Sequence, residues 1–189
     1  MIAGLERREP TASLAFYERA RPILDRTLSR LLGARDPDYE DVAQAALYEL
    51  VDSIGRFRGE CPLDAWLSIV CARVAYRQIR RRRLERRFFA PTAPDESLHG
   101  SYAPPTPFAS RQAVERIRAH LGHMDQKRTW TFLLHDVYGY GLEEVSQIMD
   151  TTVSAAQSRL VRGRREIHDR IRVDPGLCRF LEDLCEDVP

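Results

Sequence analysis

The sequence predicts an all-α protein made of two small helical domains joined by a flexible linker. Three observations support this fold class: apolar residues recur at three- and four-residue steps, a proline-rich stretch interrupts them near the middle, and no segment alternates as a strand would. A hydrophobic content of 43% over 189 residues is sufficient to build a core. We place the domains at residues 1–88 and 110–173, with a linker at 89–109 and an acidic C-terminal tail at 174–189.

The first domain is expected to hold three or four helices. Residues 14–32 have helical periodicity, with Pro22 tolerated if it opens a new turn after a short lead-in segment. Asp36 and Pro37 suit the N-cap and first position of a second helix, which Gly55 closes. The apolar stripe of that helix consists of Tyr39, Val42, Ala43, Ala46, Leu50, Val51 and Ile54.

A third helix is predicted from about residue 63 to residue 83, and it combines arginines with aromatic side chains. Arginine accounts for eight of the residues from 73 to 87, against the single acidic Glu85. Trp66 and Tyr76 lie on this helix and Phe57 lies in the loop before it, an arrangement typical of surfaces that hold unstacked bases of a single strand. Trp66 falls on the apolar stripe and favours a core position, so Tyr76 is expected to be the partly exposed ring.

Charge is segregated along the chain although the net charge is only +1. Residues 36–52 carry six acidic side chains and no basic one, residues 73–87 are strongly basic, and the tail is acidic again. Such a chain could bind a basic protein and an anionic polymer at the same time. Lys127 is the only lysine, so nearly all of the positive charge is guanidinium, which can bind phosphates or guanine edges through two parallel hydrogen bonds.

The second domain has the layout of a helix-turn-helix. A short helix at residues 142–149, a turn at 150–152 and a longer basic helix at 153–172 follow two further amphipathic segments. The start of the long helix would reach base edges in a major groove, and Arg162, Arg164 and Arg165 would meet phosphates. The predicted duplex-reading residues are Ser154, Ala155, Gln157, Ser158, Arg159 and Arg162.

These features resemble bacterial extracytoplasmic-function sigma factors of the sigma-70 family, the promoter-recognising subunits of RNA polymerase. In region 2 the resemblance rests on an acidic opening from Asp38, the loop Arg56-Phe57-Arg58-Gly59-Glu60, the pair Trp66-Leu67 and the arginine cluster. In region 4 it rests on Glu143-Glu144-Val145 and on Ser158-Arg159-Leu160 followed by further arginines. It covers roughly residues 12–172, with both regions in the order of the family.

The resemblance implies partners and roles for individual residues. The partners would be core RNA polymerase, through its β′ clamp helices and β flap, and promoter DNA, with an anti-sigma factor as a possible regulator. Polymerase contacts would fall to Glu40, Asp41, Gln44 and Glu49. The opened strand of the −10 element would meet Phe57, Arg58, Trp66, Arg73, Tyr76, Arg77 and Arg80, and the helix from Val153 would read the −35 element as duplex.

Four residues depart from the pattern of that family. Met124-Asp125 stands where Leu-Pro is usual, Gln157 replaces a frequent lysine, and Asp150 replaces a turn glycine. Aspartate tolerates the left-handed conformation better than most residues, so the turn is expected to survive. Loss of the lysine removes one expected phosphate contact.

Two other classes of function are consistent with the same helices. A helix-turn-helix repressor would normally dimerise on a palindrome, but no dimer helix is evident and a repressor has no use for the arginine-rich helix of the first domain. A sigma-like adaptor would keep the fold and lack the DNA contacts. Co-purification with core polymerase and run-off transcription distinguish the three.

No catalytic site, metal site or cofactor is expected. The five histidines form no catalytic or zinc-binding pattern, and His120 and His123 are expected to be solvated. The four cysteines have neither zinc nor disulfide-framework spacing. Cys178 and Cys185 share one side of an amphipathic tail, which would pack on the second domain or fold against the first as an acidic mimic of DNA or of an anti-sigma factor. Charged residues near the start and the lack of a membrane-spanning run predict a cytoplasmic protein without membrane insertion.

Overall fold

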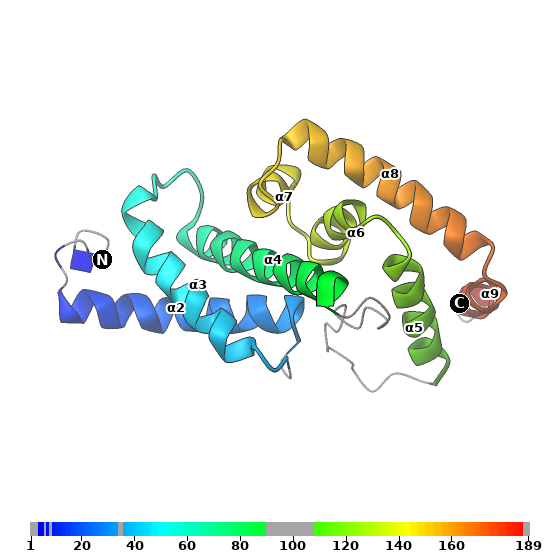
Figure 1. The fold of residues 1–189 in the computed structure, drawn as a ribbon, viewed down its shortest axis with the longest axis horizontal. Helices are drawn as coiled ribbons and strands as arrows, with labels where there is room; N and C mark the ends of the chain where they lie inside the picture. Colours follow the sequence, from blue (N-terminus) through cyan, green and yellow to red (C-terminus); the bar gives the residue numbers. More distant parts are fainter. Residues whose placement is uncertain (1–3, 6, 8, 34–35, 90–107, 187–189) are drawn as a thin grey trace. The chain divides into compact units, whose positions relative to one another are not determined.

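The computed structural model describes the chain except for residues 1–3, 6, 8, 34–35, 90–107 and 187–189. Every regular element among the described residues is helical, which confirms the predicted fold class (Figure 1). The chain divides into two compact units, Met1–Tyr102 and Ala103–Pro189. The proline-rich segment at 90–107 lies outside the described residues, so each unit is described by itself.

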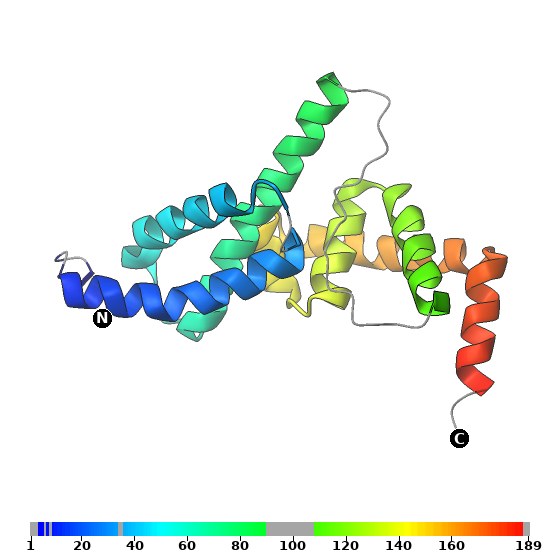
Figure 2. The same cartoon turned by 90° about the horizontal axis from the view of Figure 1, so that it is seen from below.

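The first unit is a bundle of three long helices, α2 (Pro10–Leu31), α3 (Tyr39–Ser53) and α4 (Leu63–Phe89). Helix α4 packs against both α2 and α3, and Figures 1 and 2 show it crossing the other two. Fully buried side chains from all three helices form the core, among them Leu24, Leu28, Leu50 and Leu67. Burial of these apolar side chains supplies most of the stability of the bundle, because helices in proteins are stabilised mainly by the packing of their apolar faces.

Helix α2 is continuous through Pro22, so the expected start of a new helical turn there is wrong. Proline removes one backbone hydrogen bond, a cost of about 3 kcal/mol in a helix interior. Pro22 itself is exposed, while Ala20 and Leu24 on either side are completely buried. The core contacts of both halves therefore hold the helix together across the missing bond.

The start and the end of α3 also differ from the prediction. The helix begins at Tyr39 rather than after Asp36, because the Asp36 carboxylate instead accepts the backbone N–H of Asp38 at 3.0 Å. At the other end the chain continues as a short 3-10 helix, η1 (Ile54–Arg56), so Gly55 does not terminate the helical path. Glycine in the left-handed conformation is found instead at Gly59, in the following loop, where φ is 73°.

The second unit contains α5 (Phe108–Gly122), α6 (Gln126–Phe132), a π-helical turn η2 (Leu133–Val137), α7 (Leu142–Ile148), α8 (Val153–Arg172) and α9 (Pro175–Glu186). Trp130 of α6 and Val145 and Ile148 of α7 are buried, and both of these helices pack against the long helix α8. The short helix, tight turn and long helix appear where the sequence predicted them.

Local hydrogen bonds account for the sharp turns of this unit. The Asp125 side chain accepts the backbone N–H of Arg128 at the start of α6, and Thr152 does the same for Ala155 at the start of α8. Asp150 has a φ of 52°, the left-handed conformation expected for it in the turn between α7 and α8.

The C-terminal segment folds as a helix of the second unit. Helix α9 packs against α5 and α8, with Leu177 buried. Of the two arrangements considered for the tail, packing on the second domain is the one observed. The side chain of Cys185 lies outside the described residues.

Candidate nucleic-acid and protein interfaces

The first two turns of α8 present a polar surface that suits base recognition. Ser154, Gln157, Ser158 and Arg162 are exposed, and Ala155 and Arg159 are half-buried beside them. Ala156 and Leu160, on the opposite side, are buried against the unit and fix the rotation of the helix. The exposed hydroxyl, amide and guanidinium groups offer donors and acceptors of the kind that read major-groove edges.

The arginines of α8 do not all remain available for phosphates. Arg162 and Arg165 are exposed, and the Nε of Arg162 donates to the backbone oxygen of Ser158 at 3.1 Å. Arg164 instead binds both carboxylate oxygens of Asp136, at 2.8 and 2.6 Å. This bidentate pair lowers the pKa of Asp136 below its usual value. Arg164 therefore joins α8 to the η2 turn, and its contact with a phosphate stays a prediction in which the phosphate would compete with Asp136.

The arginine cluster of α4 is divided in the same way. Arg77 and Arg80 are exposed. Arg82 is bound by two aspartates, with both terminal nitrogens 2.8 Å from Asp36 oxygens and one 2.7 Å from Asp38. Its side chain is only 13% exposed. Arg82 thus holds the segment before α3 against α4.

Arg73 and Glu49 form an ion pair with each other. The Arg73 Nη2 lies 3.0 Å from a Glu49 carboxylate oxygen, and both side chains are about three-quarters buried. The sequence resemblance had placed these residues in two different interfaces, one for the opened strand and one for the polymerase. In the free protein each neutralises the other.

Two aromatic rings meet at the start of α4. The Phe57 and Trp66 ring centroids are 5.4 Å apart with the planes tilted by 53°, and both rings are half-buried. Exposed Arg58 follows Phe57 in the loop. A tilted aromatic pair beside a guanidinium offers faces on which an unstacked base can lie.

Tyr76 does not present a partly exposed ring, so that expectation is wrong. It is only 6% exposed, because it lies on the same side of α4 as the buried residues Ile69, Ala72 and Ile79. Helical periodicity places residues three and four apart on one face, and this face is the core. Tyr76 therefore supports the bundle rather than a surface.

The exposed side of α3 combines acidic and apolar groups. Glu40, Asp41 and Gln44 are exposed, and Glu49 is half-buried. Tyr48 and Val51 are 68% and 57% exposed on the same helix. Val51 was expected in the apolar core stripe, which is wrong. Tyr48 was not predicted as a surface residue, although a large ring outside the apolar stripe of a helix indicates an interaction surface.

A groove between α3 and α4 brings opposite charges together. It has a volume of about 530 Å³ and is lined by Asp38, Asp41 and Glu49 from α3 and its N-cap and by Arg77 and Arg81 from α4. The acidic and basic blocks that are separate along the chain are thus neighbours in the bundle. Their fields partly cancel at a distance and act mainly on groups that approach closely.

Histidine and cysteine side chains have structural surroundings in the described part of the chain. No group of three or more metal-ligating side chains is found among the described residues. His120 was expected to be solvated, which is wrong, since its Nε2 lies 2.8 Å from an Asp174 oxygen. Burial raises the pKa of the Cys71 thiol to about 12, which leaves an inert thiol in the core.

Comparisons with known proteins agree with the two units. The family described as Sigma-70 region 2 matches residues 16–85, and Sigma-70, region 4 matches residues 114–167. A comparison with curated protein sequences gives no match. No helix in the described part of the chain is long and apolar enough to cross a membrane.

Solved structures with the same fold include two sigma factors. One is RpoE in complex with the anti-sigma factor NepR from Bartonella quintana, with a TM-score of 0.58 and 18% identity over 85% of this chain and 98% of that one. The other is CnrH in complex with the cytosolic domain of CnrY, with a TM-score of 0.53 and 18% identity over 92% of this chain and 96% of that one.

Proposed function

Because this chain belongs to the sigma-70 family of RNA polymerase subunits, we propose that it directs core RNA polymerase to specific promoters as a sigma factor of the extracytoplasmic-function type. The family is non-enzymatic, so any catalysis of transcription belongs to the core enzyme. The two regions that match, 2 and 4, are those that recognise the two promoter elements in this type of sigma factor. Region 2 would melt and read the −10 element, and region 4 would read the −35 element.

One observation carries this proposal: the exposed polar start of α8 on a rigid helix-turn-helix. Thr152 caps the helix, and the buried residues Ala156 and Leu160 set the direction in which Gln157 and Ser158 project. Side chains fixed in this way can discriminate base edges, whereas mobile side chains would lose that discrimination to entropy. The −35 duplex is the proposed ligand of this surface.

In the first unit, the opened strand and the polymerase would bind neighbouring surfaces. Phe57, Trp66 and Arg58 at the start of α4, with Arg77 and Arg80 further along it, suit bases and phosphates of the −10 strand. The acidic residues of α3, together with exposed Tyr48, suit a basic protein surface such as the β′ clamp helices. The β flap would bind the second unit.

An anti-sigma factor is proposed as a further partner, by analogy with the two solved complexes. RpoE and CnrH were each captured with an inhibitory protein or its cytosolic domain, and this chain has their fold. The exposed apolar side chains of α3 would be one surface for such a protein to cover.

The test is binding to core polymerase followed by run-off transcription. Gln44→Arg places a positive charge on the proposed polymerase surface and is expected to weaken core binding at least about tenfold, because like charges at an interface cost several kcal/mol. Ala15→Arg, which introduces the same positive charge at an exposed site on α2, is the control. A repressor would fail to bind core at all, and an adaptor would bind it without supporting transcription.

A further inference from the structure

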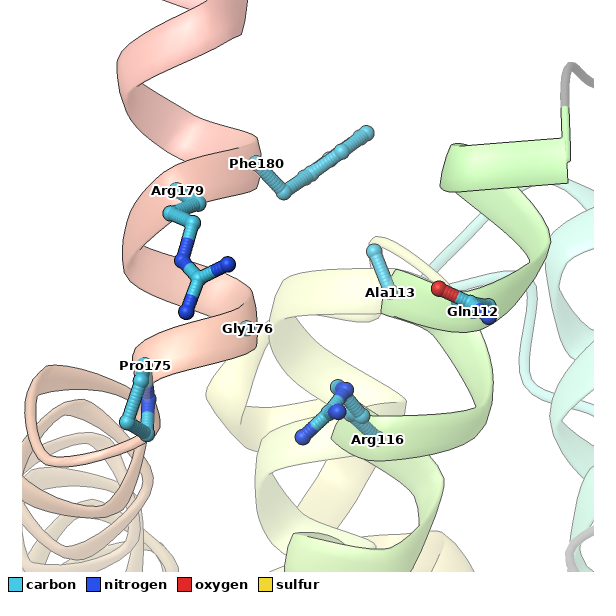
Figure 3. Close-up of a pocket in the computed structure, with 7 residues that line it drawn as sticks. All are labelled: Gln112, Ala113, Arg116, Pro175, Gly176, Arg179 and Phe180. Atoms are coloured by element: carbon cyan, nitrogen blue, oxygen red, sulfur yellow. The ribbon is translucent and has the colours of Figure 1, made fainter.

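The pocket between α5 and α9 lies partly outside the matched region 4, which ends at residue 167. Its volume is about 410 Å³, within the range of about 300–1,000 Å³ typical of small-molecule sites. Helix α5 contributes Gln112, Ala113 and Arg116, and α9 contributes Pro175, Gly176, Arg179 and Phe180 (Figure 3). The pocket exists only because the C-terminal helix packs against α5.

A buried carboxylate, that of Asp174, contacts two of the residues that line this pocket. One oxygen of Asp174 accepts the backbone N–H groups of Gly176 and Leu177, at 2.9 and 3.2 Å, and lies 3.1 Å from Arg116 Nη1. The other oxygen lies 2.8 Å from His120 Nε2. With its side chain 9% exposed, Asp174 is fully engaged and offers nothing to a ligand. The same bonds occupy the first free N–H groups of α9, so the helix terminus is not the binding element.

Arg116 is held in a defined position against α9. A Cβ on Gly176 would lie 2.6 Å from the Arg116 Cζ, so the guanidinium rests directly on the backbone of Gly176, and a larger residue there would require the end of the Arg116 side chain to shift. The Arg116 side chain is 51% exposed, and Nη1 is its only atom bound to Asp174. Nitrogens of the fork therefore remain available to a ligand.

The pocket carries an excess of positive charge. Arg179 faces Arg116 across the gap between the helices, and among the described residues it has no ion pair or hydrogen bond (Figure 3). Of the two guanidinium groups that line the pocket, only Arg116 is paired with a described carboxylate, that of Asp174, which His120 and the backbone of α9 also use. A phosphomonoester carries about −1.5 to −2 charges at neutral pH and accepts bidentate hydrogen bonds from arginine, which matches this pair better than a singly charged carboxylate does.

The other end of the pocket is apolar. Phe180 extends from α9 toward Ala113 on α5, and the Gln112 amide lies beside Ala113 (Figure 3). A phosphate between the two arginines would leave room for a planar or apolar group against Phe180, with the amide of Gln112 as a polar partner.

We propose that the pocket between α5 and α9 binds a small phosphorylated metabolite through Arg116 and Arg179, with its non-phosphate part against Phe180. The residues of this site are separate in sequence from the exposed start of α8, and the proposed binding does not depend on promoter recognition. If the chain does not bind such a metabolite, the proposed sigma function is unaffected.

Calorimetric titration of the full chain with adenosine monophosphate and with inorganic phosphate tests the proposal. We expect saturable binding of the nucleotide that is tighter than that of free phosphate, and a shift of the Gly176 amide resonance on addition of either. Arg179→Gln should weaken both at least about tenfold, because a charge-assisted hydrogen-bond partner is lost. Arg26→Gln, an exposed arginine of the first unit, should leave both unchanged.

Phe180→Ala tests the contact with the non-phosphate part of the ligand. It should weaken the binding of the nucleotide and leave the binding of free phosphate unchanged. Absence of saturable binding at millimolar nucleotide, equal affinity for nucleotide and phosphate, or equal losses in the Arg26 and Arg179 variants would each overturn the proposal.

Discussion

Arg82 shows how a residue from a basic cluster can be committed to the fold. Its guanidinium binds Asp36 and Asp38 at 2.7–2.8 Å and is almost fully buried. Removing one partner of a buried ion pair leaves uncompensated charge, which costs more than the pair contributed. Arg82→Gln is therefore expected to lower the free energy of unfolding of the first unit by about 2 kcal/mol.

Chemical denaturation followed by circular dichroism measures this change. Arg80→Gln is the matched control, since Arg80 is exposed on the same helix and should change stability by less than about 0.5 kcal/mol. Equal effects of the two substitutions would show that the aspartate contacts contribute nothing to stability.

Asp174 gives the attachment of α9 a defined pH dependence. The hydrogen bond with His120, helped by the backbone N–H groups of Leu177 and Gly176 and by Arg116, lowers the pKa of this carboxyl from 3.8 to about 2. A lowered pKa means that the folded state favours the charged carboxylate. The stability that ionised Asp174 contributes is therefore fully present above the ordinary carboxyl pKa of 3.8 and is lost as the pH falls through about 2. The α9 attachment should therefore weaken between about pH 4 and pH 2.

The Leu177 amide resonance, monitored during an acid titration, reports this loss. Asp174→Asn should abolish the transition, whereas Asp169→Asn, at an exposed carboxylate of α8, should keep it. A transition that survives in Asp174→Asn would assign the pH dependence to another group.

Single residues show where sequence reasoning succeeds and where it stops. The left-handed Asp150 was predicted because its effect is local. Arg164 and Asp136 are 28 positions apart, and their pairing depends on the π-helical turn at 133–137, which leaves no periodic signal. Tyr76 was misplaced because its neighbouring arginines were given more weight than its three- and four-residue spacing from Ala72 and Ile79, which places it on the buried face.

At the scale of elements, α8 should contact DNA in two ways, through base edges at its start and through phosphates further along. Gln157 lies on the exposed face at the start of the helix, where an amide can bind an adenine edge, while Arg165 lies two turns later and suits a phosphate. Gln157→Ala should weaken the binding free energy for the preferred −35 sequence by about 1–3 kcal/mol. It should also reduce the discrimination between bases at one base pair of that sequence.

Arg165→Ala provides the contrast. It should weaken all sequences equally and reduce the slope of log affinity against log salt by about 0.9. Binding of holoenzyme to a set of single-base −35 variants at several salt concentrations measures both effects. If Arg165→Ala changed the base preference, or Gln157→Ala only the salt slope, the assigned roles would be wrong.

Helix identity was easier to predict than helix boundaries. Apolar periodicity placed α2, α3, α4, α7 and α8, because each must bury one face. The break expected at Pro22 did not occur since buried neighbours hold the two halves, and α4 runs to Phe89 where it was expected to end near residue 83. Boundaries depend on tertiary contacts that a single segment does not encode.

At the scale of the whole molecule, the net charge of +1 conceals acidic and basic surfaces that partly neutralise each other. Arg73 is paired with Glu49 and Arg82 with two aspartates, so the free protein offers fewer cations to DNA than its sequence suggests. The order of the two regions was predictable from composition and motifs. Packing of the C-terminal segment on the second unit was one of the expected arrangements, but the ion pair between Asp174 and His120 that attaches α9 to α5 was not, because the two residues are 54 positions apart.

This charge distribution predicts that the free protein opens promoter DNA negligibly. Extracting a base from the stack costs a few kcal/mol, and one aromatic pair with Arg58, Arg77 and Arg80 provides too few contacts to offset that cost over several base pairs. Core polymerase must supply the remaining free energy.

Fluorescence of 2-aminopurine placed in the −10 element should therefore rise only when core polymerase is present together with the chain. Phe57→Ala should reduce that rise in the holoenzyme, whereas Tyr17→Ala, at an exposed ring on α2, should not. A strong signal from the chain alone would mean that its own surface melts the duplex, and the division of work between sigma subunit and core enzyme would have to be abandoned.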